Sequence, residues 1–456
     1  MVIEKQLDAI FKAYDIRGIY GTELTDEIAY DFGRAFGTFL REKGEHFAVV
    51  GMDNRLSSPL IKMHLVKGLC STGIDVFDIG TVITPIFYYA TELYEIKGGV
   101  MITASHNPAE YNGFKVQYDG GTIFGETLTH LKERIEAGRF LRGKGSVTEL
   151  SPVESYYEMI LEKIKLGPRK LKVVVDPANG TASLFAETLL QRLGCEVIPI
   201  NNISDASFPN HFPDPTRLAN LQDLIKTVQK EKADVGIGYD GDGDRIGVVS
   251  EKGEVIYGDM LMILYWREIL RKHPGAEAIV EVKCSDVLVQ EIKKLGGQPF
   301  FYKTGHSLIK AKMKEIGAIF TGEMSGHMFF ADEYYGFDDA LYATARLLRI
   351  LSNTDEPFSA LLADVPTTYP TPELHAIVAE AEKKAYVKKT TQMLEEVAKE
   401  VITVDGVRAT FEDGWGLVRA SNTGPSLVVR AEGTSEAARD RIYHIIETAL
   451  FPLVIE

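Results

Sequence analysis

Cysteine is scarce in this 456-residue sequence, and no long apolar run is present. The few cysteines are far apart and form no Cys-X-X-Cys pair, which excludes a disulfide-stapled scaffold and a cysteine zinc site and favours a reducing, cytoplasmic environment. The longest uncharged run, 79–91, is too short to cross a bilayer, and charged side chains interrupt residues 1–12, where a signal peptide is apolar. We therefore expect neither export nor a membrane span. The cysteines are Cys70, Cys195 and Cys284.

Positive charge is also in deficit. The 50 lysines and arginines stand against 65 aspartates and glutamates, and the net charge of -15 argues against nucleic acid or an anionic membrane as the main partner. A local basic pocket remains compatible with that balance. Hydrophobic residues make up 45% and charged residues 25%, as in ordinary globular proteins. At about 150 residues per domain, the length predicts roughly three domains or more.

One structural unit occurs three times along the chain. In each copy an apolar strand enters a polar turn, a helix follows, and a second strand comes after a glycine. Each copy then closes on a strand that leads into an unusual polar loop. This pattern predicts sheets covered by helices, and ligands bind beyond the carboxyl ends of such strands. The first strands are 47–51, 171–175 and 278–282, and the closing strands are 99–103, 233–238 and 317–321.

The sequence pattern changes after residue 352, and a proline-rich stretch at 365–372 precedes a segment that does not follow the repeated unit. There we expect a charged helix at 376–400, strands near 402 and at 416–419 and 427–431, and a closing helix from 436, capped by Thr434 or Ser435. The predicted fold is α/β, with three related mixed-sheet domains and a smaller C-terminal α+β domain. The predicted domains are 1–150, 151–252, 253–366 and 367–456.

Three aspartates alternate with glycines in the second polar loop, at Asp240, Asp242 and Asp244. Like charges this close repel one another, and a divalent cation relieves the repulsion; hard carboxylate oxygens favour Mg²⁺. The alternatives are a solvated acidic turn and an EF-hand, for which Glu251 stands at loop position 12. Arg245 replaces the glycine expected at position 6, and a strand precedes the loop, so the EF-hand is disfavoured.

Ser105 lies in the first polar loop, beside His106 and ahead of Lys115. The sequence has no Gly-X-Ser-X-Gly elbow, which disfavours acyl transfer. Alone, a serine after a strand is more often a turn residue. Beside a metal loop it becomes a candidate phosphate carrier.

Further polar loops could recognise an anion or a sugar. The 419–425 loop offers a guanidinium, two hydroxyls and an amide, which suits a phosphate monoester, although a plain turn explains it equally well. The third loop offers Glu323, Ser325 and His327 for sugar hydroxyls and proton exchange. Tyr14 and Arg17 near the start and the cationic loop 303–306 are weaker signals.

Taken together, these loops resemble those of the α-D-phosphohexomutase superfamily, in particular its bacterial phosphomannomutase/phosphoglucomutase group, over the whole chain. Residues 103–108 match the family's phosphoserine loop, and residues 240–245 match its Mg²⁺ loop. Residues 322–327 match its sugar-specificity loop, and residues 419–423 match its phosphate-binding loop. The resemblance implies four domains around a central cleft.

The resemblance also implies an activity: an isomerase that interconverts mannose and glucose 1-phosphates with their 6-phosphates through phosphorylated Ser105 and a hexose 1,6-bisphosphate. Mg²⁺ and an activating glucose 1,6-bisphosphate are implied, and the partners are hexose phosphates; monomer and dimer are both compatible. A phosphoglucosamine mutase, which typically carries Gln in place of Met324, is an alternative, as are a phosphatase with the same Ser/Mg²⁺ site and a non-catalytic sensor. The implied catalytic residues are Ser105, Lys115, His327, Arg17 and Arg245, and the implied metal site is Ser105, Asp240, Asp242 and Asp244. The implied substrate-binding residues are Tyr14, Arg17, His106, Arg245, Lys283, His306, Glu323, Ser325, His327, Arg419, Ser421, Asn422 and Thr423.

Overall fold

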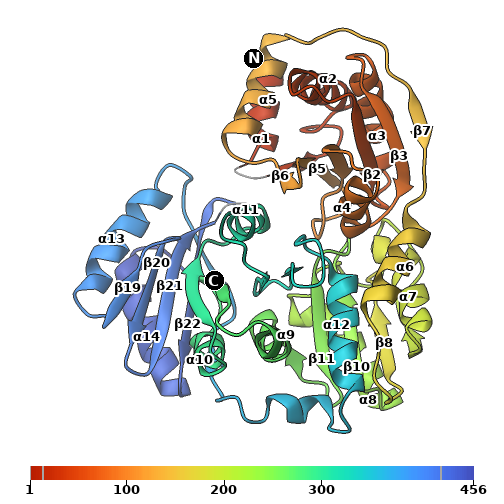
Figure 1. Ribbon diagram of the computed structural model, residues 1–456. Helices are drawn as coiled ribbons and strands as arrows, with labels where there is room; N and C mark the ends of the chain where they lie inside the picture. Colours follow the sequence, from red (N-terminus) through yellow and green to blue (C-terminus); the bar gives the residue numbers. More distant parts are fainter. Residues whose placement is uncertain (1, 13–14, 422–423, 456) are drawn as a thin grey trace. The chain divides into compact units, whose positions relative to one another are not determined.

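The computed structural model describes residues 2–12, 15–421 and 424–455, in two compact units (Figure 1). The first unit comprises Met1–Tyr265 and Ser325–Leu361, and the second comprises Trp266–Met324 and Leu362–Glu456. Helix α9 (Gly258–Lys272) contains the boundary between them. In the part of the chain described, no helix combines the length and apolar character that crossing a membrane requires.

The first unit opens with a mixed sheet flanked by helices (Figure 1). Its strands are β1 (Ile16–Ile19), β2 (Phe47–Met52), β3 (Asp75–Thr81), β4 (Gly98–Ile102), β5 (Tyr111–Tyr118), β6 (Gly121–Thr122) and β7 (Val147–Glu149), and its helices are α1 (Val2–Ile10), α2 (Asp26–Glu42), α3 (Ser58–Cys70), α4 (Thr84–Leu93) and α5 (Glu126–Ala137). The strand order is β1-β5-β4-β2-β3-β7, with β6 beside β5. β2 runs parallel to β3 and β4, whereas β5 is antiparallel to β4 and β1.

The core of this sheet is mainly aliphatic with a few stacked aromatic rings, and two of its helices pack closely against each other. Phe32 of α2 stacks on Phe114 of β5 with ring centroids 4.8 Å apart. Helices α2 and α3 touch through Gly33 and Gly68, where an added Cβ would lie 2.3 Å and 2.1 Å from backbone oxygens of the facing helix. Only glycine allows this approach. The helices therefore hold β2 and β4, whose carboxyl ends carry the polar turns.

The second sheet of the first unit repeats the parallel core. Its strands are β8 (Lys172–Asp176), β9 (Glu196–Pro199), β10 (Val235–Tyr239), β11 (Ile246–Ser250) and β12 (Val255–Ile256), in the order β12-β11-β10-β8-β9. Its neighbours are α6 (Val153–Lys163), η1 (Thr181–Leu184), α7 (Ala186–Arg192), η2 (Leu218–Leu221), α8 (Gln222–Glu231), β16 (Met328–Phe330) and α12 (Ala340–Ser352). β8, β9 and β10 are parallel, and the antiparallel pair β10–β11 encloses the aspartate loop.

The second unit contains a small parallel pair and an antiparallel sheet. Its first elements are β13 (Glu277–Glu281), α10 (Asp286–Lys294), β14 (Gln298–Tyr302), α11 (His306–Ile316) and β15 (Phe320–Gly322), with η3 (Phe358–Leu362) at the boundary. The others are β17 (Tyr369–Pro370), β18 (Leu374–Ile377), α13 (Lys383–Glu395), β19 (Glu400–Ile402), β20 (Val407–Phe411), β21 (Gly414–Ala420), β22 (Ser426–Gly433) and α14 (Glu436–Leu450). The strand order of the antiparallel sheet is β17-β22-β21-β20-β19, with β18 also on β22.

Three expectations for local structure need correction. The helix expected at 376–400 starts only at Lys383, because 374–377 form β18, which pairs Leu374 with Val429 and buries Ala376. Strand β20 was not expected. The closing strand of the third repeat is β15 rather than 317–321, because Gly317, at φ 68°, ends α11 in the left-handed conformation. The closing helix does start at Glu436, and Ser435 caps it.

A buried carboxylate joins three segments of the first unit. Asp339 caps α12 and accepts hydrogen bonds from the hydroxyls of Tyr156 (2.9 Å) and Tyr334 (2.6 Å) and from the amide of Tyr342 (2.8 Å). Burial raises the pKa of Asp339 to about 6, although these hydrogen bonds oppose the shift. The carboxylate is therefore a stabilising acceptor that is costly to ionise.

Replacing Asp339 is expected to destabilise the first unit. Asp339→Ala leaves three buried donors without their acceptor and removes a helix cap, so we expect a loss of about 3 kcal/mol in the free energy of unfolding. Because the folded pKa is raised, the wild type should gain stability relative to Asp339→Asn as the pH falls from about 7 to about 4. Thermal and urea unfolding measure both effects. Asp355→Ala, at an exposed position, is the control; an equal loss there would contradict the assignment.

Candidate active site

Ser105 follows β4 and points its hydroxyl at the aspartate loop. The side chain is 2% exposed, its Oγ donates to Asp240 Oδ2 at 2.8 Å, and it lies 3.1 Å from His106 Nδ1. The backbone has φ 52°, in the left-handed region that costs a non-glycine residue about 1 kcal/mol or more. The Ser105 amide donates to Thr103 Oγ1 at 2.8 Å. A strained turn therefore fixes the direction of this hydroxyl.

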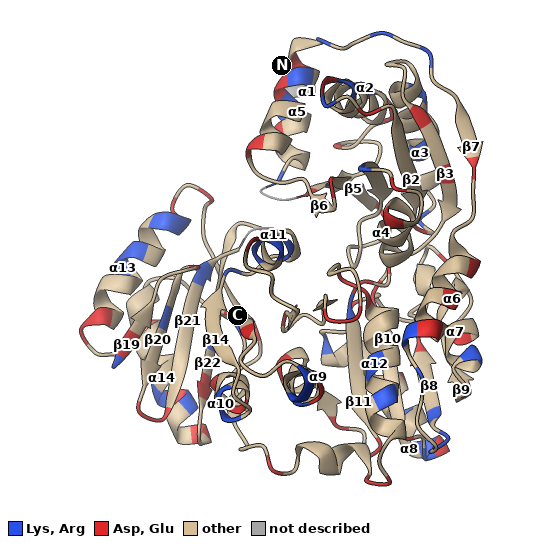
Figure 2. Ribbon diagram, viewed as in Figure 1, with Lys and Arg blue, Asp and Glu red and all other residues tan. Residues whose placement is uncertain are grey.

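The loop between β10 and β11 contains three buried aspartates. Figure 2 shows acidic residues in red along the ribbon of the chain. Asp240, Asp242 and Asp244 each offer an oxygen within 4.8 Å of the others. Asp240 Oδ1 accepts from the amides of Asp244 and Arg245, both at 3.1 Å. Asp242 Oδ1 and Asp244 Oδ1 are buried and accept no hydrogen bond from any described residue. Free, hard oxygens of this kind fit a divalent cation.

Lys115, on β5, neutralises part of this acidic cluster. Its Nζ lies 2.7 Å from Asp242 Oδ2 and contacts Asp244. Burial lowers the pKa of Lys115, but Asp242 and Asp244 outweigh burial and hold it well above its usual range. Three carboxylates and one ammonium leave two net negative charges, which matches a dication.

The pKa values of Asp240 and Asp242 shift in opposite directions. Burial, followed by repulsion from Asp244 and Asp242, raises the pKa of Asp240 well above its usual range. Burial also acts to raise the pKa of Asp242, but Lys115, Thr84 and Arg17 reverse the shift and lower it. Thr84, at the start of α4, donates to Asp242 Oδ2 at 2.6 Å. The charge of Asp240 is thus less well compensated than that of Asp242.

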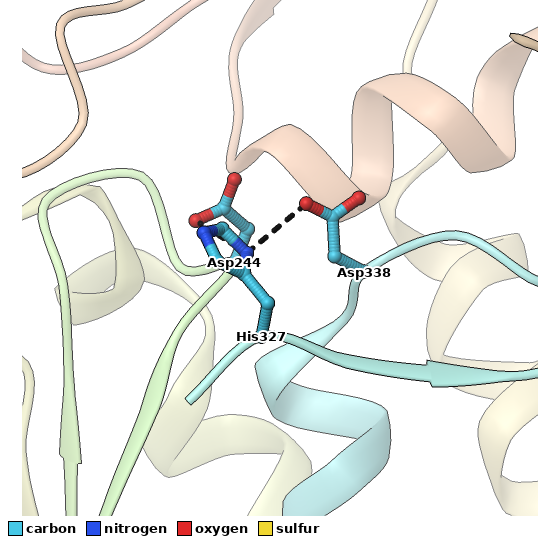
Figure 3. Close-up of side chains that lie close together, drawn as sticks. All are labelled: Asp244, His327 and Asp338. Carbon is cyan, nitrogen blue, oxygen red and sulfur yellow. Dashed lines mark ion pairs between the residues drawn. The ribbon is translucent and has the colours of Figure 1, made fainter. Parts of the chain in front are cut away.

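His327 lies between the aspartate loop and a second carboxylate (Figure 3). Its Nδ1 is 3.1 Å from Asp338 Oδ2 and 3.6 Å from Asp244 Oδ1. Arg245 Nε donates to His327 Nε2 at 3.0 Å, which assigns the imidazole hydrogen to Nδ1. The same Arg245, followed by Arg17, adds to burial in lowering the pKa of His106 well below its usual range.

Arg17, on β1, reaches the Ser105 loop. Its Nη1 donates to Asn107 Oδ1 at 2.5 Å, and its Nη2 pairs with Asp15 at 3.0 Å. The first unit therefore brings together Arg17, Ser105, His106, Lys115, the three aspartates, Arg245 and His327. Ser325 lies in the same unit and is half-buried. Tyr14 lies outside the described residues.

The second unit holds a separate group of the expected residues. Lys283 Nζ lies 3.0 Å from Glu373 Oε2 and 3.4 Å from Glu281 Oε1, and the Lys283 charge lowers the pKa of Glu373 to about 2. Glu323 and Arg419 lie close enough to Lys283 to affect its pKa. His306 starts α11, beside Gly305, whose amide donates to Glu323 Oε1 at 2.8 Å.

Arg419 is the buried guanidinium of this second group. Its Nε donates to Asp405 Oδ2 at 2.8 Å, and its Nη2 makes no hydrogen bond to the described residues. Ser421 follows on the same loop and is buried, whereas Asn422 and Thr423 lie outside the described residues. A guanidinium with a free edge is suited to binding an anion.

Several supporting residues were not singled out by the sequence patterns. Asp338 beside His327, Glu373 beside Lys283 and Asp405 beside Arg419 are carboxylates that hold a cationic or titratable group in place. The doublet Asp338-Asp339 just before α12 is the one local signal that pointed to such a site. The others act over long sequence separations.

Models of the phosphoglucomutase/phosphomannomutase family match almost the whole chain. Its α/β/α domain I matches residues 8–142, domain II matches 154–253, domain III matches 257–369, and the C-terminal domain matches 373–449. The fold is thus the four-domain architecture of that family, with three α/β/α domains and a C-terminal domain.

Individual relatives agree with this match. A phosphomannomutase/phosphoglucomutase of Pseudomonas aeruginosa is 45% identical over 442 residues, 97% of this chain and 95% of the relative. A phosphoglucomutase of Neisseria gonorrhoeae is 44% identical, with 95% of each chain covered. The crystal structure of a phosphoglucomutase/phosphomannomutase family protein of Burkholderia thailandensis superimposes with a TM-score of 0.90 at 42% identity, covering 98% of this chain and 99% of that one. The chain belongs to the phosphoglucomutase/phosphomannomutase family.

Proposed function

We propose that this protein is a phosphohexomutase, an isomerase that interconverts the 1-phosphates and 6-phosphates of mannose and glucose through phosphorylated Ser105. The observation that carries the proposal is the 2.8 Å hydrogen bond from Ser105 Oγ to one of three clustered, buried aspartates. The names of the relatives support the same activity and the hexose phosphate substrates. The proposed domains remain 1–150, 151–252, 253–366 and 367–456, and a cytoplasmic location fits the scarcity of cysteine.

In the proposed reaction, the bond from phosphorus to Ser105 Oγ breaks as a hydroxyl of the sugar phosphate forms a bond to the same phosphorus. The hydroxyl proton passes to a base, Ser105 Oγ takes up a proton as it leaves the phosphorus, and a hexose 1,6-bisphosphate results. This intermediate then turns by about half a revolution and returns its other phosphate to Ser105, where the reverse proton transfer completes the exchange. Such transfer depends mainly on positioning and on neutralising charge.

Asp240, Asp242, Asp244 and the phosphate on Ser105 would hold Mg²⁺, which neutralises charge on the transferring phosphoryl group when bound. Lys115 keeps its proton because of the neighbouring carboxylates, so we assign it to charge compensation. His327, which accepts from Arg245 and lies beside Asp338, carries its hydrogen on Nδ1 and is the better candidate to donate a proton. Arg17 and His106 would contact the phosphoryl group on Ser105, and glucose 1,6-bisphosphate would phosphorylate Ser105 when the enzyme is inactive.

For the second unit, we propose that Lys283, His306, Glu323, Arg419 and the 421–423 loop bind the sugar and its distal phosphate. Ser325, in the first unit, is proposed as a further sugar-binding residue. Met324 favours glucose and mannose over glucosamine, and its amide donates to Glu281 Oε2 at 2.9 Å.

The test is ³¹P NMR of the protein with Mg²⁺ and a trace of glucose 1,6-bisphosphate. Mannose 1-phosphate, glucose 1-phosphate and glucosamine 1-phosphate are supplied in separate tubes. Conversion of the first two into their 6-phosphates, without free phosphate, is the expected result. Reaction of glucosamine 1-phosphate alone would overturn the specificity, and release of inorganic phosphate in every tube would replace the mutase by a phosphatase. Binding without conversion would indicate a sensor.

Arg419→Ala is expected to weaken substrate binding more than turnover. Loss of a charge-assisted contact to phosphate should raise KM by about 10- to 100-fold, with kcat reduced far less. Arg419→Lys retains the positive charge but not the planar guanidinium, so its KM should lie between those of the wild type and Arg419→Ala. Arg441→Ala removes an exposed arginine of the same unit that pairs with Asp413 and is the control. An unchanged KM in Arg419→Ala would remove this loop from phosphate binding.

A further inference from the structure

One buried arginine holds the backbone of the Ser105 loop. Arg55, just after β2, is 1% exposed. Its Nη2 donates to the carbonyls of Ser105 (2.8 Å) and Asn107 (2.7 Å). Its Nη1 donates to the carbonyls of Pro108 (2.5 Å) and Tyr111 (3.1 Å). Four bonds from one guanidinium thus fix the loop that carries the proposed phosphate acceptor.

Every nitrogen of this guanidinium is engaged. The Nε–H donates to Asp53 Oδ2 at 3.1 Å, and the same carboxylate accepts from Ser58 Oγ at 2.5 Å and from the Arg55 amide at 3.0 Å. The side chain uses the five donors that arginine has, in a planar fork that lysine cannot reproduce. Its geometry is therefore specific to guanidinium and not only to positive charge.

The preceding residue, Asn54, connects the same turn to the aspartate loop. Asn54 donates from its amide to Thr181 Oγ1 at 3.0 Å and from its Nδ2 to the Asn179 carbonyl at 2.9 Å. The Thr181 amide in turn donates to the Gly241 carbonyl at 2.9 Å, within the aspartate loop. The turn 53–55 thus fixes the Ser105 loop on one side and the loop of Asp240 and Asp242 on the other.

The backbone conformation of Ser105 depends on these contacts with Arg55. Its φ of 52° is unfavourable for serine, and the hydroxyl must still point at Asp240. The backbone carbonyl of Ser105 is itself an acceptor of Arg55, so releasing Arg55 lets this strained residue relax.

We propose that Arg55 is a positioning residue for phosphoryl transfer, which sets the direction of the Ser105 side chain relative to the three aspartates through the carbonyls of residues 105–111. Arg55 is buried, and its hydrogen bonds go to Asp53 and to the loop carbonyls. This assignment rests on the proposed function, in which Ser105 carries the phosphoryl group. A misplacement of about 1 Å at a reacting group can cost about 10²-fold in rate.

The test compares Arg55→Lys with a buried arginine remote from the loop. Arg346 is also 1% exposed, lies in the same unit and pairs with Asp332 through both terminal nitrogens, at 2.9 Å and 3.0 Å. Arg55→Lys should lower kcat by about 100-fold or more with KM changed less than about 3-fold. Arg346→Lys should lower the melting temperature comparably and leave kcat nearly unchanged.

Hydrogen–deuterium exchange gives a readout independent of turnover. Amides of residues 103–111 should exchange faster in Arg55→Lys and at the wild-type rate in Arg346→Lys. Unchanged exchange in this segment would overturn the positioning role, whereas absence of mutase activity in the wild type would overturn only the proposed function. If Arg55→Lys and Arg346→Lys lost kcat equally, Arg55 would contribute only to the stability of the fold. If Arg55→Lys does not fold, Asn54→Ala, at a half-buried position, disturbs the same turn and should give the same split between kcat and KM.

Discussion

Ser105→Ala should lose turnover by at least about 10⁴-fold, because the variant has no oxygen to carry the phosphoryl group. Binding of glucose 1-phosphate, measured by calorimetry, should persist, since Ser105 holds the sugar only through the phosphate it carries. The fold should persist as well. Alanine keeps the backbone, and the variant loses the side-chain hydrogen bonds of Ser105 Oγ to Asp240 and to His106 Nδ1. Intact mass should show phosphate transferred from glucose 1,6-bisphosphate to the wild type and none to the variant.

The matched control is Ser183→Ala. Ser183 lies in η1 of the same unit, and its Oγ makes no hydrogen bond to the described residues. Its substitution should change neither turnover nor the attached phosphate. If Ser105→Ala retained activity, another residue would have to carry the phosphoryl group. If it lost substrate binding as well as turnover, with a lowered melting temperature, the result would report a folding defect.

The repeated strands were predictable because their signal is local. The apolar runs at 47–51 and 171–175 correspond to β2 and β8, and each is followed by the polar turn expected from the sequence. Strand β18 could not be predicted in this way, because it exists only through pairing with β22, about fifty residues further along the chain. Charged residues around it give a helical pattern locally, and the pairing overrides that pattern.

The same difference between local signals and long-range contacts applies to the residues of the candidate site. The spacing of Asp240, Asp242 and Asp244 is a local signal. The structure places them beside Ser105, a juxtaposition that the repeated strand-end loops and the family resemblance both indicated. Arg55 could not be found, although its turn was part of the repeat, because its partners are backbone carbonyls some fifty residues away. Every residue has a backbone carbonyl, so contacts with carbonyls cannot be recognised from the residue types in a sequence. Asp338 likewise depends on where β16 brings His327.

Asp240→Asn should nearly abolish turnover and yet stabilise the metal-free protein. The asparagine Oδ1 can still accept from the amides of Asp244 and Arg245, so the loop keeps its turn. One of three crowded carboxylates is replaced, and burial, followed by repulsion from Asp244 and Asp242, disfavours the anionic form of Asp240. We therefore expect a higher melting temperature than the wild type in EDTA, with turnover lower by about 10³-fold or more in Mg²⁺.

The response to Mg²⁺ separates a metal site from a merely acidic loop. Added Mg²⁺ should raise the melting temperature of the wild type, because a cation that binds only the folded state stabilises it, and should do so much less in Asp240→Asn. EDTA should remove wild-type activity, and Mg²⁺ should restore it. Asp223→Asn, at an exposed position on α8, should behave as the wild type in every measurement. A variant that lost activity but kept the full Mg²⁺ response would place the cation elsewhere, and Asp240 would then act on Ser105 alone.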